Sequence, residues 1–453
     1  MANIFKFSPP PSELYDAGKE VVQSLVSRGH KAFMVGGCIR DAFLDIAPSE
    51  YDITTSATPD EITDIFSHTV PVGASFGVVL VIHDEYRFEV ATFRKDLSYS
   101  DGRHPDSVIY SADEKEDVTR RDFTINALLY DPFREEIMDY VGAVEDFESR
   151  TVRSIGNPLE RFREDKLRML RAIRFSARFD YSIEEDTYSA VKQHASHITE
   201  VSLERIRDEV TKIASQRRPG RGLRLLLDST LLTHILPEVA EMDGVPQPPQ
   251  FHPEGDVFTH TCLVLDELYQ YSEGDITPEL AMGALLHDVG KPTTYSESDR
   301  IRFNAHDTVG AQMAESICRK LRFSKKQTQR ITELVRHHLK FKDALKMRTS
   351  TLKKFLAMPH FEDHLALHYA DCMASHGQLK SYAFIKSKLG ELEEEEIKPK
   401  PLLTGDDLIE LGYVPGPVFR EILRFVEEAQ LEGVVGDKEG AKALVREKFP
   451  LPE

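Results

Sequence analysis

Residues 34–59 constrain the fold of this chain more than any other stretch. An apolar strand end leads through Gly36 and Gly37 into a short helix, and a second strand then carries Glu50 and Asp52. Side chains two positions apart project from the same face of a strand. Adjacent carboxylates repel each other unless divalent cations lie between them and a phosphate. The stretch therefore predicts a magnesium and nucleotide-phosphate site.

The glycine pair adds to this prediction, because glycine lets the backbone approach an anion and a helix N-terminus offers free N–H groups. Taken singly, a glycine pair is typical of a turn, and two acids on a strand are typical of a solvated face. Their joint spacing, with Arg40 and Asp41 on the intervening helix, favours a functional site.

Length and composition bound the class of protein. A chain of 453 residues with 41% hydrophobic and 29% charged residues is typical of about two to four globular domains. No apolar run approaches the roughly 20 residues of a membrane helix, and the N-terminus lacks a secretory pattern. The four cysteines are far apart, as buried thiols in a reducing cytosol are. We therefore expect a cytoplasmic protein with no membrane partner.

The distribution of charge is uneven. A net charge of −19 argues against a general nucleic-acid coat protein, yet basic residues recur densely between residues 150 and 224. That region can bind RNA locally, while acidic residues elsewhere, notably 391–396, limit nonspecific adhesion. The alternative is that these residues form solvated helix faces.

Hydrophobic periodicity predicts an α+β head followed by helical domains. An amphipathic helix opens the head, strands are expected at 77–82 and 86–93, and the polar stretch 94–108 is expected to be a mobile loop. The expected domains are the head at 1–148, a helical neck and body at 149–241, a proline-rich linker at 242–256, a histidine-rich helical domain at 257–390, and an acidic linker with a helical tail at 391–453.

Two further motifs follow in the head. Glu89 lies on the second expected strand and can face Glu50 and Asp52, and three carboxylates around two magnesium ions suit phosphoryl transfer. Arg120 and Arg121, in the segment RRDFTINA, can bind triphosphate oxygens through paired hydrogen bonds. The alternatives are that Glu89 is an exposed acid on a strand and that the arginines form the charged start of a helix.

Asp165 and Arg168 are three residues apart on an expected helix and face the same side. One interpretation is an ordinary ion pair worth about 0.3–0.5 kcal/mol. The other is a donor–acceptor pair that reads the Watson–Crick edge of a nucleotide, where each hydrogen-bonded pair discriminates by about 1–3 kcal/mol. The second interpretation predicts nucleotide selection without a nucleic-acid template.

These motifs, together with SLERIRDE at 202–209, occur in the order found in class II tRNA nucleotidyltransferases. The chain resembles that family closely over residues 14–235, and LLTGDDLIELGYVPGP resembles its C-terminal region. The resemblance implies a polymerase-beta-like head on a small mixed sheet, followed by all-α neck, body and tail domains. The implied reaction is attack of a tRNA 3′-hydroxyl on the α-phosphate of CTP or ATP, with Mg²⁺ as cofactor and pyrophosphate as leaving group.

The resemblance also implies site residues. It assigns Glu50, Asp52 and Glu89 to catalysis and Mg²⁺ binding. It assigns the following residues to nucleotide binding: Gly36, Gly37, Arg40, Asp41, Arg120, Asp122, Asn126, Asp165, Arg168, Arg171 and Arg174. Glu50 departs from the family, which usually has Asp there. Since magnesium demands near-octahedral geometry, the longer side chain requires an adjusted strand or rotamer, and we expect activity to be retained or reduced.

A second set of residues is independent of the head. His260, His287, Asp288, His306, His337 and Asp371 follow the order found in HD-type metal phosphohydrolases. Such mixed nitrogen and oxygen ligands suit Ni²⁺, Mn²⁺ or a similar metal, although a lone helical histidine is usually structural. In this interpretation His306 and His337 bind a second metal or a phosphate. The resemblance implies phosphatase or 2′,3′-cyclic phosphodiesterase activity that cleans damaged tRNA ends.

The leading hypothesis is thus a bifunctional enzyme of the tRNA 3′ end. The residues 98–108 resemble a loop that CC-only enzymes lack, which disfavours CC-only addition. An A-adding enzyme or a poly(A) polymerase stays open, and so does an RNA-binding or regulatory protein with an inactive head, which Glu50 motivates. The sequence leaves the oligomeric state open.

Overall fold

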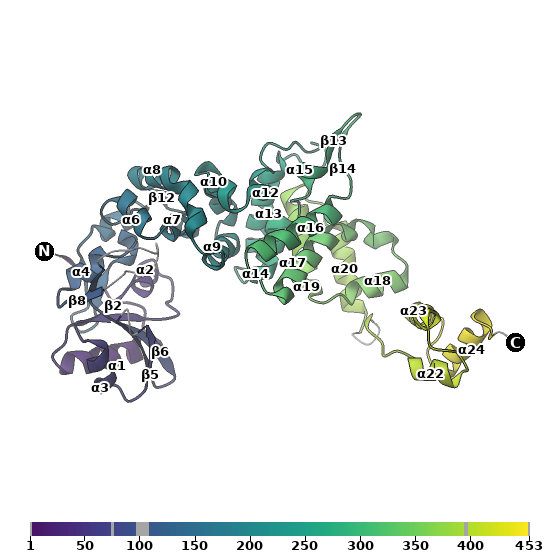
Figure 1. The fold of residues 1–453 in the computed structure, drawn as a ribbon, viewed down its shortest axis with the longest axis horizontal. Coiled ribbons are helices and arrows are strands. Elements are labelled where there is room, and N and C mark those ends of the chain that lie inside the picture. Colours follow the sequence, from purple (N-terminus) through teal and green to yellow (C-terminus); the bar gives the residue numbers. More distant parts are fainter. Residues whose placement is uncertain (1, 74–76, 97–107, 394–396, 452–453) are drawn as a thin grey trace. The chain divides into compact units, whose positions relative to one another are not determined.

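The computed structural model describes residues 2–73, 77–96, 108–393 and 397–451. Its contacts divide the chain into two units (Figure 1). Unit 1 comprises Met1–Glu241 and Ile317–Phe323, and unit 2 comprises Met242–Ser316 and Ser324–Glu453. Most of the expected mobile loop at 94–108 lies outside the described residues.

Unit 1 is built on an eight-stranded mixed sheet in the order β1-β10-β9-β2-β3-β6-β5-β4. Its strands are β1 (Asn3–Lys6), β2 (Ala32–Val35), β3 (Asp52–Thr55), β4 (Thr69–Gly73), β5 (Val78–His83), β6 (Tyr86–Thr92), β9 (Leu129–Asp131) and β10 (Glu136–Asp139). Strands β3 and β6 run parallel, whereas the other neighbouring strands are antiparallel. This sheet, followed by helices, confirms the predicted α+β class.

Short helices join and cover the strands of this sheet. They are α1 (Glu13–Ser27), α2 (Gly37–Phe43), α3 (Pro59–Ile65), α4 (Glu114–Thr119), the 3₁₀ turn η2 (Thr124–Asn126) and α5 (Ala143–Glu148). The expected opening helix is α1, which buries Val21, Val22 and Leu25 and begins at a capping Ser12. A separate pair of strands, β7 (Arg94–Asp96) and β8 (Val108–Tyr110), flanks the loop.

The rest of unit 1 is helical. Its helices are α6 (Pro158–Glu164), α7 (Leu167–Phe179), α8 (Glu185–His194), η3 (Ala195–Glu200), α9 (Leu203–Ser215), α10 (Pro219–Asp228), α11 (Leu231–Ile235) and α12 (Pro237–Ala240). A short parallel pair, β11 (Thr151–Val152) and β12 (Ser182–Ile183), lies between them. Helix α7 buries most of its residues and contacts both α9 and α10, so it forms the centre of this region.

Unit 2 is almost entirely helical. Its helices are α13 (Val257–Tyr271), α14 (Pro278–Leu286), α15 (Lys291–Thr294), α16 (His306–Lys320), α17 (Lys325–His337), η4 (His338–Lys346), α18 (Thr349–Leu356), α19 (Phe361–Ala374), α20 (Lys380–Glu391), α22 (Gly405–Glu410), α23 (Pro417–Leu431) and α24 (Lys438–Lys448). The last residues of α16, from Ile317 on, belong to unit 1. One hairpin, β13 (Tyr295–Glu297) with β14 (Ile301–Phe303), interrupts the helices of unit 2. Helix α14 is buried continuously over residues 280–286 and contacts α13, α17 and α19. An apolar helix of this kind belongs in a core, and it carries His287 at its C-terminal end.

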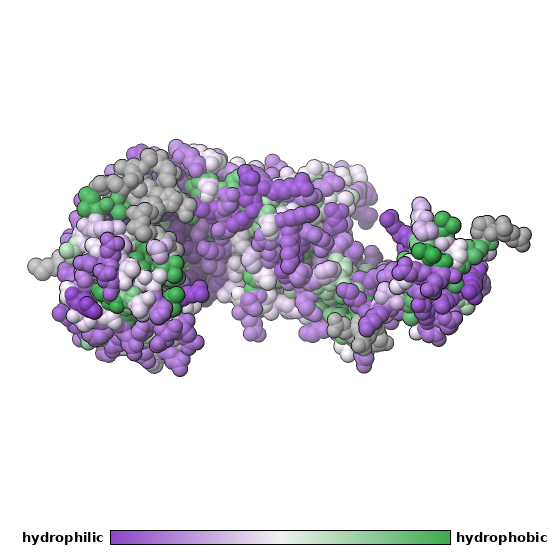
Figure 2. All heavy atoms as spheres, turned by 60° about the horizontal axis from the view of Figure 1, so that its bottom comes forward, coloured by the Kyte–Doolittle hydropathy of each residue, from purple (hydrophilic) through white to green (hydrophobic). Residues whose placement is uncertain are grey.

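The segment 242–256, expected as a linker from its prolines, is folded into unit 2. Met242 and Gln247 are buried there, and Asp256 caps α13 by accepting a hydrogen bond from the backbone of Thr259. On the face drawn in Figure 2, hydrophilic residues cover most of the surface. Among the helices that the structure describes, none has both the length and the apolar character that crossing a membrane requires.

Candidate active site and metal centre

The acidic residues of the head lie at the beginning of β3. Asp52 is the first residue of that strand, and the register that sets Ile53 beside Val90 of β6 brings Asp52 beside Glu89. Glu50 lies in the loop before β3, so its predicted place on the strand was wrong. The reason is that Asp52 pairs with the last residue of β2, after which no partner continues the ladder.

Like charges surround Asp52. Burial and the nearby carboxylates of Glu50 and Glu89 raise its pKa to about 6, although Arg121 opposes the shift. A divalent cation would relieve this repulsion and favour the ionised form of the carboxyl groups. The donor chemistry of the three carboxylates therefore fits a hard metal such as Mg²⁺.

Gly36, which has no side chain, lies beside this acidic group. Its φ of 83° is a left-handed conformation that favours glycine, and it caps α2. A Cβ atom at this position would lie 3.6 Å from Asp52 Oδ2 and 3.4 Å from Arg121 Nη1. Gly37 follows as the first residue of α2. Both distances are ordinary van der Waals contacts, so it is the positive φ that favours glycine at this position.

A buried acid positions the neighbouring arginines. Asp117 is fully buried and accepts two hydrogen bonds from Arg120, at 2.9 and 2.6 Å, and one from Arg121 at 3.2 Å. The Nε atom of Arg121 is buried and has no hydrogen-bond partner. The motif analysis named both arginines and missed Asp117, which orients them; of the two, Arg121 lies beside the glycine turn.

A chain of hydrogen bonds connects α2, η2 and α7. Arg40 donates to Asp41 at 2.8 Å and to the side-chain oxygen of Asn126 at 2.6 Å. Asn126 in turn donates to Asp122 at 3.0 Å, and Arg171 donates to the other oxygen of Asp122 at 2.7 Å. Burial would raise the pKa of Asp122, but Arg171 and Asn126 hold it well below its usual range. The structure thus brings these five predicted residues together.

The same network reaches further along α7. Arg178 donates to Asp41 at 3.0 Å, and the guanidinium of Arg40 lies 5.2 and 5.0 Å from the rings of Phe175 and Phe179. Stacking and ion pairing together hold a buried arginine in one orientation. Arg178 is a member of this network that the motif analysis did not assign.

The expected base-reading pair does not share a helix. Helix α6 ends at Glu164 and α7 begins at Leu167, so Asp165 lies at the break with extended backbone. Asp165 pairs with Arg205 at 2.8 Å, and Arg168 pairs with Glu164 at 2.7 Å. The prediction of an i,i+3 helical pair was wrong, because Asp165 accepts a hydrogen bond from the backbone of Leu167. The two residues remain in one turn, since the Arg168 amide donates to the Asp165 carbonyl.

Arg174 contacts the interior of unit 1. It donates to Glu209 of α9 at 2.7 Å, and its guanidinium lies 4.3 Å from the Phe175 ring. Both members of the ion pair are buried. This residue of the nucleotide-binding set therefore joins α7 to α9.

In unit 2, four imidazole rings surround one carboxylate. The Nε2 atoms of four histidines lie 3.2 to 3.8 Å from Asp288: His287 at 3.2 Å, His306 at 3.5 Å, His338 at 3.7 Å and His260 at 3.8 Å. All four Nε2 atoms are buried and have no hydrogen-bond partner. Buried polar atoms normally have partners, so these converging lone pairs fit a bound metal ion.

Backbone carbonyls orient three of these rings. The Nδ1 atoms of His287, His306 and His338 lie 2.7, 2.8 and 2.7 Å from the carbonyl oxygen three residues earlier. A ring that donates from Nδ1 keeps the Nε2 lone pair for a metal. Burial lowers the pKa of His306, and that of His338 to about 3, so both rings stay neutral. The three rings are therefore oriented with Nε2 available to a metal ion.

Asp371 and Lys291 complete the group. Asp371 lies 3.1 Å from His260 Nε2, and Lys291 Nζ lies 2.6 Å from Asp288. Burial would raise the pKa of Asp288, but His287 and Lys291 hold it well below the usual value. Both acids are therefore ionised at neutral pH.

His338, not His337, faces Asp288, so this part of the prediction was wrong. Consecutive helical residues point about 100° apart, and α17 ends at His337 where η4 begins. The ring of His337 instead lies 6.2 Å from that of His364. Motif order could not choose between two adjacent histidines. It also missed Lys291, and Glu254, whose carboxylate lies 2.6 Å from His260 Nδ1.

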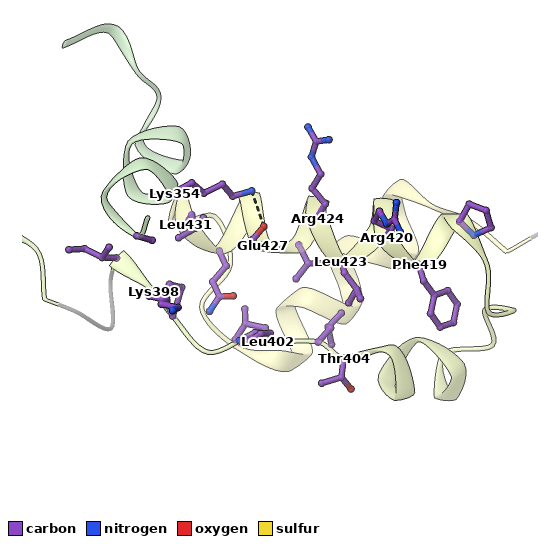
Figure 3. A pocket seen from close by; sticks show the side chains of 18 of the residues that line it. Lys354, Lys398, Leu402, Thr404, Phe419, Arg420, Leu423, Arg424, Glu427 and Leu431 are labelled. Atoms are coloured by element: carbon purple, nitrogen blue, oxygen red, sulfur yellow. Dashed lines mark ion pairs between the residues drawn. The ribbon is translucent and has the colours of Figure 1, made fainter. Parts of the chain in front are cut away.

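A cavity of 1180 Å³ lies elsewhere in unit 2, between the tail helix α23 and Lys354 of α18 (Figure 3). Its walls are mainly apolar, and an ion pair of 2.8 Å joins Lys354 to Glu427 at its edge. Glu427 is the single carboxylate among its described lining residues. The cavity lacks the convergent ligands of the two centres above.

Three family models match: the poly A polymerase head domain over residues 32–153, the probable RNA and SrmB-binding site of polymerase A over 180–243, and the HD domain over 257–366.

Among curated relatives, the CCA-adding enzyme of Enterococcus faecalis is 43% identical over 208 residues, which are 46% of this chain and 51% of that protein. That of Ligilactobacillus salivarius is 29% identical over 441 residues, 94% of this chain and 96% of that protein. Apart from the Ligilactobacillus salivarius protein, the match spans about half the length of these curated relatives.

A solved structure has the same fold. The Bacillus stearothermophilus CCA-adding enzyme in complex with CTP superposes with a TM-score of 0.77 at 23% identity, covering 97% of this chain and 98% of that one.

Proposed function

Because the chain belongs to the family of class II CCA-adding enzymes and poly(A) polymerases, we propose that it adds CCA to the 3′ end of tRNA from CTP and ATP without a template. The observation that carries this proposal is the group of Glu50, Asp52 and Glu89 beside the glycine turn. An anionic triphosphate bound next to three carboxylates requires divalent cations, and we infer Mg²⁺.

In this proposal, each part of the head has one task. The carboxylates hold Mg²⁺, which when bound activates the attacking hydroxyl and neutralises charge on the triphosphate. Gly36 and Gly37 admit the phosphates, and Arg121, held by Asp117, lies beside the same turn, with Arg120 bound to the same acid. The guanidinium groups offer donors that match phosphate oxygens.

The sugar and base would be bound beyond this turn. Arg40, Asp41, Asn126 and Asp122 form a fixed polar surface through their mutual hydrogen bonds. We propose that this surface orients the ribose, since a network whose members are already paired is rigid before binding.

We propose that Asp165 and Arg168 select the base, with Arg171 and Arg174 as support from α7, the helix of Arg168. Asp165 and Arg168 are paired with Arg205 and Glu164 in this structure. An incoming base would replace contacts to those partners with its own donor and acceptor groups, which keeps the exchange of hydrogen bonds balanced.

Nucleotide incorporation on three tRNA substrates, ending before CCA, after C and after CC, tests this function. We expect addition to stop after the terminal A on all three, in the presence of Mg²⁺, CTP and ATP. Addition only to the tRNA ending in CC would indicate an A-adding enzyme, and long adenosine tails would indicate a poly(A) polymerase. Absence of all incorporation would contradict catalytic function in the head.

For unit 2 we propose a metal-dependent hydrolase that removes 2′,3′-cyclic or terminal phosphates from damaged tRNA ends. His260, His287, Asp288 and Asp371 would hold one metal, and His306 and His338 contribute ligands nearby. A bound transition metal such as Ni²⁺ or Mn²⁺ supplies an activated water. Lys291 adds a positive charge beside Asp288 that favours an anionic substrate.

Hydrolysis of 2′,3′-cyclic AMP with added Ni²⁺ or Mn²⁺ tests this second activity. We expect stimulation by the metal and its loss in Asp288→Ala. An unchanged rate in that variant would contradict the assignment.

A further inference from the structure

His260 is oriented differently from the other three imidazoles of the metal centre. His287, His306 and His338 direct Nδ1 at backbone carbonyls within their own turns. The Nδ1 atom of His260 instead lies 2.6 Å from Oε1 of Glu254. Glu254 precedes α13, the helix that carries His260, and lies in the segment 242–256.

Glu254 is held inside the protein. Its side chain is 7% exposed, and its Oε1 atom also accepts from Nδ1 of His252 at 2.9 Å. The ring of His252 packs edge-on against that of His260, with centroids 4.8 Å apart. The Oε2 atom of Glu254 is buried without a partner. A carboxylate in this setting is costly to bury, and the contact with His260 compensates part of that cost.

The same segment reaches a second ligand. Gln247 accepts a hydrogen bond from Lys291 Nζ at 2.6 Å, and that Nζ atom lies 2.6 Å from Asp288. Asp256 caps α13 through the Thr259 backbone, which fixes the end of the segment. The segment 242–256 therefore contacts the surroundings of His260 and of Asp288 at once.

We propose that Glu254 is a positioning residue of this metal centre, which holds the His260 ring with Nε2 toward Asp288 and Asp371 and makes it a stronger ligand. A carboxylate that accepts from the outer nitrogen of a histidine fixes its tautomer and increases its basicity toward a metal. The inference rests on the proposed hydrolase centre in unit 2. It deepens that proposal by adding a ligand-orienting acid from a segment whose composition is typical of a linker.

The test is the affinity of the full-length protein for Co²⁺, a probe with a visible absorption band. Glu254→Gln keeps the size of the side chain and removes its charge. We expect Co²⁺ to bind about 10–100-fold more weakly, with a shifted band. Glu254→Asp retains the carboxylate and should restore part of the affinity and the original band. Glu13→Gln is the matched control, because Glu13 belongs to unit 1, where it accepts a hydrogen bond from the Tyr86 hydroxyl.

The outcomes separate this inference from the proposed function. If the wild-type protein and Asp288→Ala both fail to bind Co²⁺ tightly, the metal centre itself is refuted. If the wild type binds Co²⁺ and Glu254→Gln binds it equally well with an unchanged band, only the role of Glu254 is refuted. Circular dichroism verifies that each variant is folded, and nucleotide addition by the head should be unchanged in all of them. A Glu254→Asp variant that binds no better than Glu254→Gln would also contradict a role for the carboxylate.

Discussion

The two charged centres of this protein are built on opposite principles. In the head, Glu50, Asp52 and Glu89 are like charges, and Glu50 and Glu89 are exposed to solvent. In unit 2, the acids Asp288 and Asp371 are surrounded by histidines and Lys291. The sign of the pKa shift reflects this contrast: it is upward for Asp52 and downward for Asp288.

The difference indicates how each centre handles its metal. The head carboxylates repel each other until a cation arrives, so metal and triphosphate are expected to bind and leave together in each cycle. The imidazoles of unit 2 are oriented in advance by their Nδ1 hydrogen bonds, so that centre is expected to retain its metal between cycles. Separate variants can test each half of this comparison.

The largest effect is expected for Asp52→Asn. Removing a metal-binding carboxylate from the strand should lower nucleotide addition by at least about 10³-fold, equivalent to about 4 kcal/mol of transition-state stabilisation. Incorporation into tRNA ending in CC measures it. Hydrolysis of 2′,3′-cyclic AMP by the same sample serves as the control and should be unchanged. Loss of both activities together would contradict the independence of the two centres.

Asp288→Ala should produce the reciprocal result. This variant loses the carboxylate that faces all four imidazoles, so we expect loss of retained metal and a drop in hydrolysis of about 10²–10³-fold. Elemental analysis after desalting measures the metal that stays bound. A desalted wild-type protein without any transition metal, or a variant that retains it, would refute the contrast between the centres.

The pH dependence of stability provides a smaller and more specific test. The pKa of Asp52 is higher in the folded protein than its usual value of 3.8. Its contribution to stability is therefore full below about pH 4 and is lost as the pH rises through about 6. Without Mg²⁺, we expect Asp52→Asn to be more stable than wild type by about 1–2 kcal/mol at pH 8. Urea unfolding of both proteins at about pH 4 and at pH 8 measures this difference in the free energy of unfolding.

Added Mg²⁺ should reduce that difference, because a bound cation offsets the repulsion in the wild-type protein. A variant that is less stable than wild type at pH 8 without Mg²⁺ would show that repulsion does not dominate at Asp52.

The smallest effect is expected for Glu50→Asp. Glu50 lies in the loop before β3, where the backbone can adjust to a side chain one methylene shorter. We therefore expect kcat/KM for nucleotide addition to change by less than about tenfold, equivalent to under about 1.4 kcal/mol. Glu50→Gln is the control that removes the charge, and it should cost more. A loss in Glu50→Asp as large as that in Asp52→Asn would show that the length of the glutamate is essential.

Local pattern was sufficient for much of the fold. The apolar run of β5, the alternation in β6 and the helical periodicity of α1 and α7 each depend on residues close in sequence, which is why these elements were predicted. The strand β1 escaped prediction because its four exposed residues carry no pattern of burial and depend on pairing with β10, far along the chain.

For the sites, residue spacing located both groups but could not complete them. The chemistry of Glu50, Asp52 and Glu89, and of His260, His287 and Asp288, follows from residue type and order. Burial and packing supplied the rest. Asp117 is buried and binds Arg120 and Arg121 one turn further along the chain, and Lys291 Nζ contacts both Asp288 and the distant Gln247.

By itself, the sequence thus determined the class of fold and the chemical character of the two centres, because these depend on short-range periodicity and on the residue types present. Tertiary structure decided which side chains face each centre. It selected His338 over His337, separated Asp165 from the helix of Arg168, and brought Glu254 to His260. The physical reason is that the direction of a side chain depends on where its element begins and ends and on what packs against it, and those are set by residues remote in sequence.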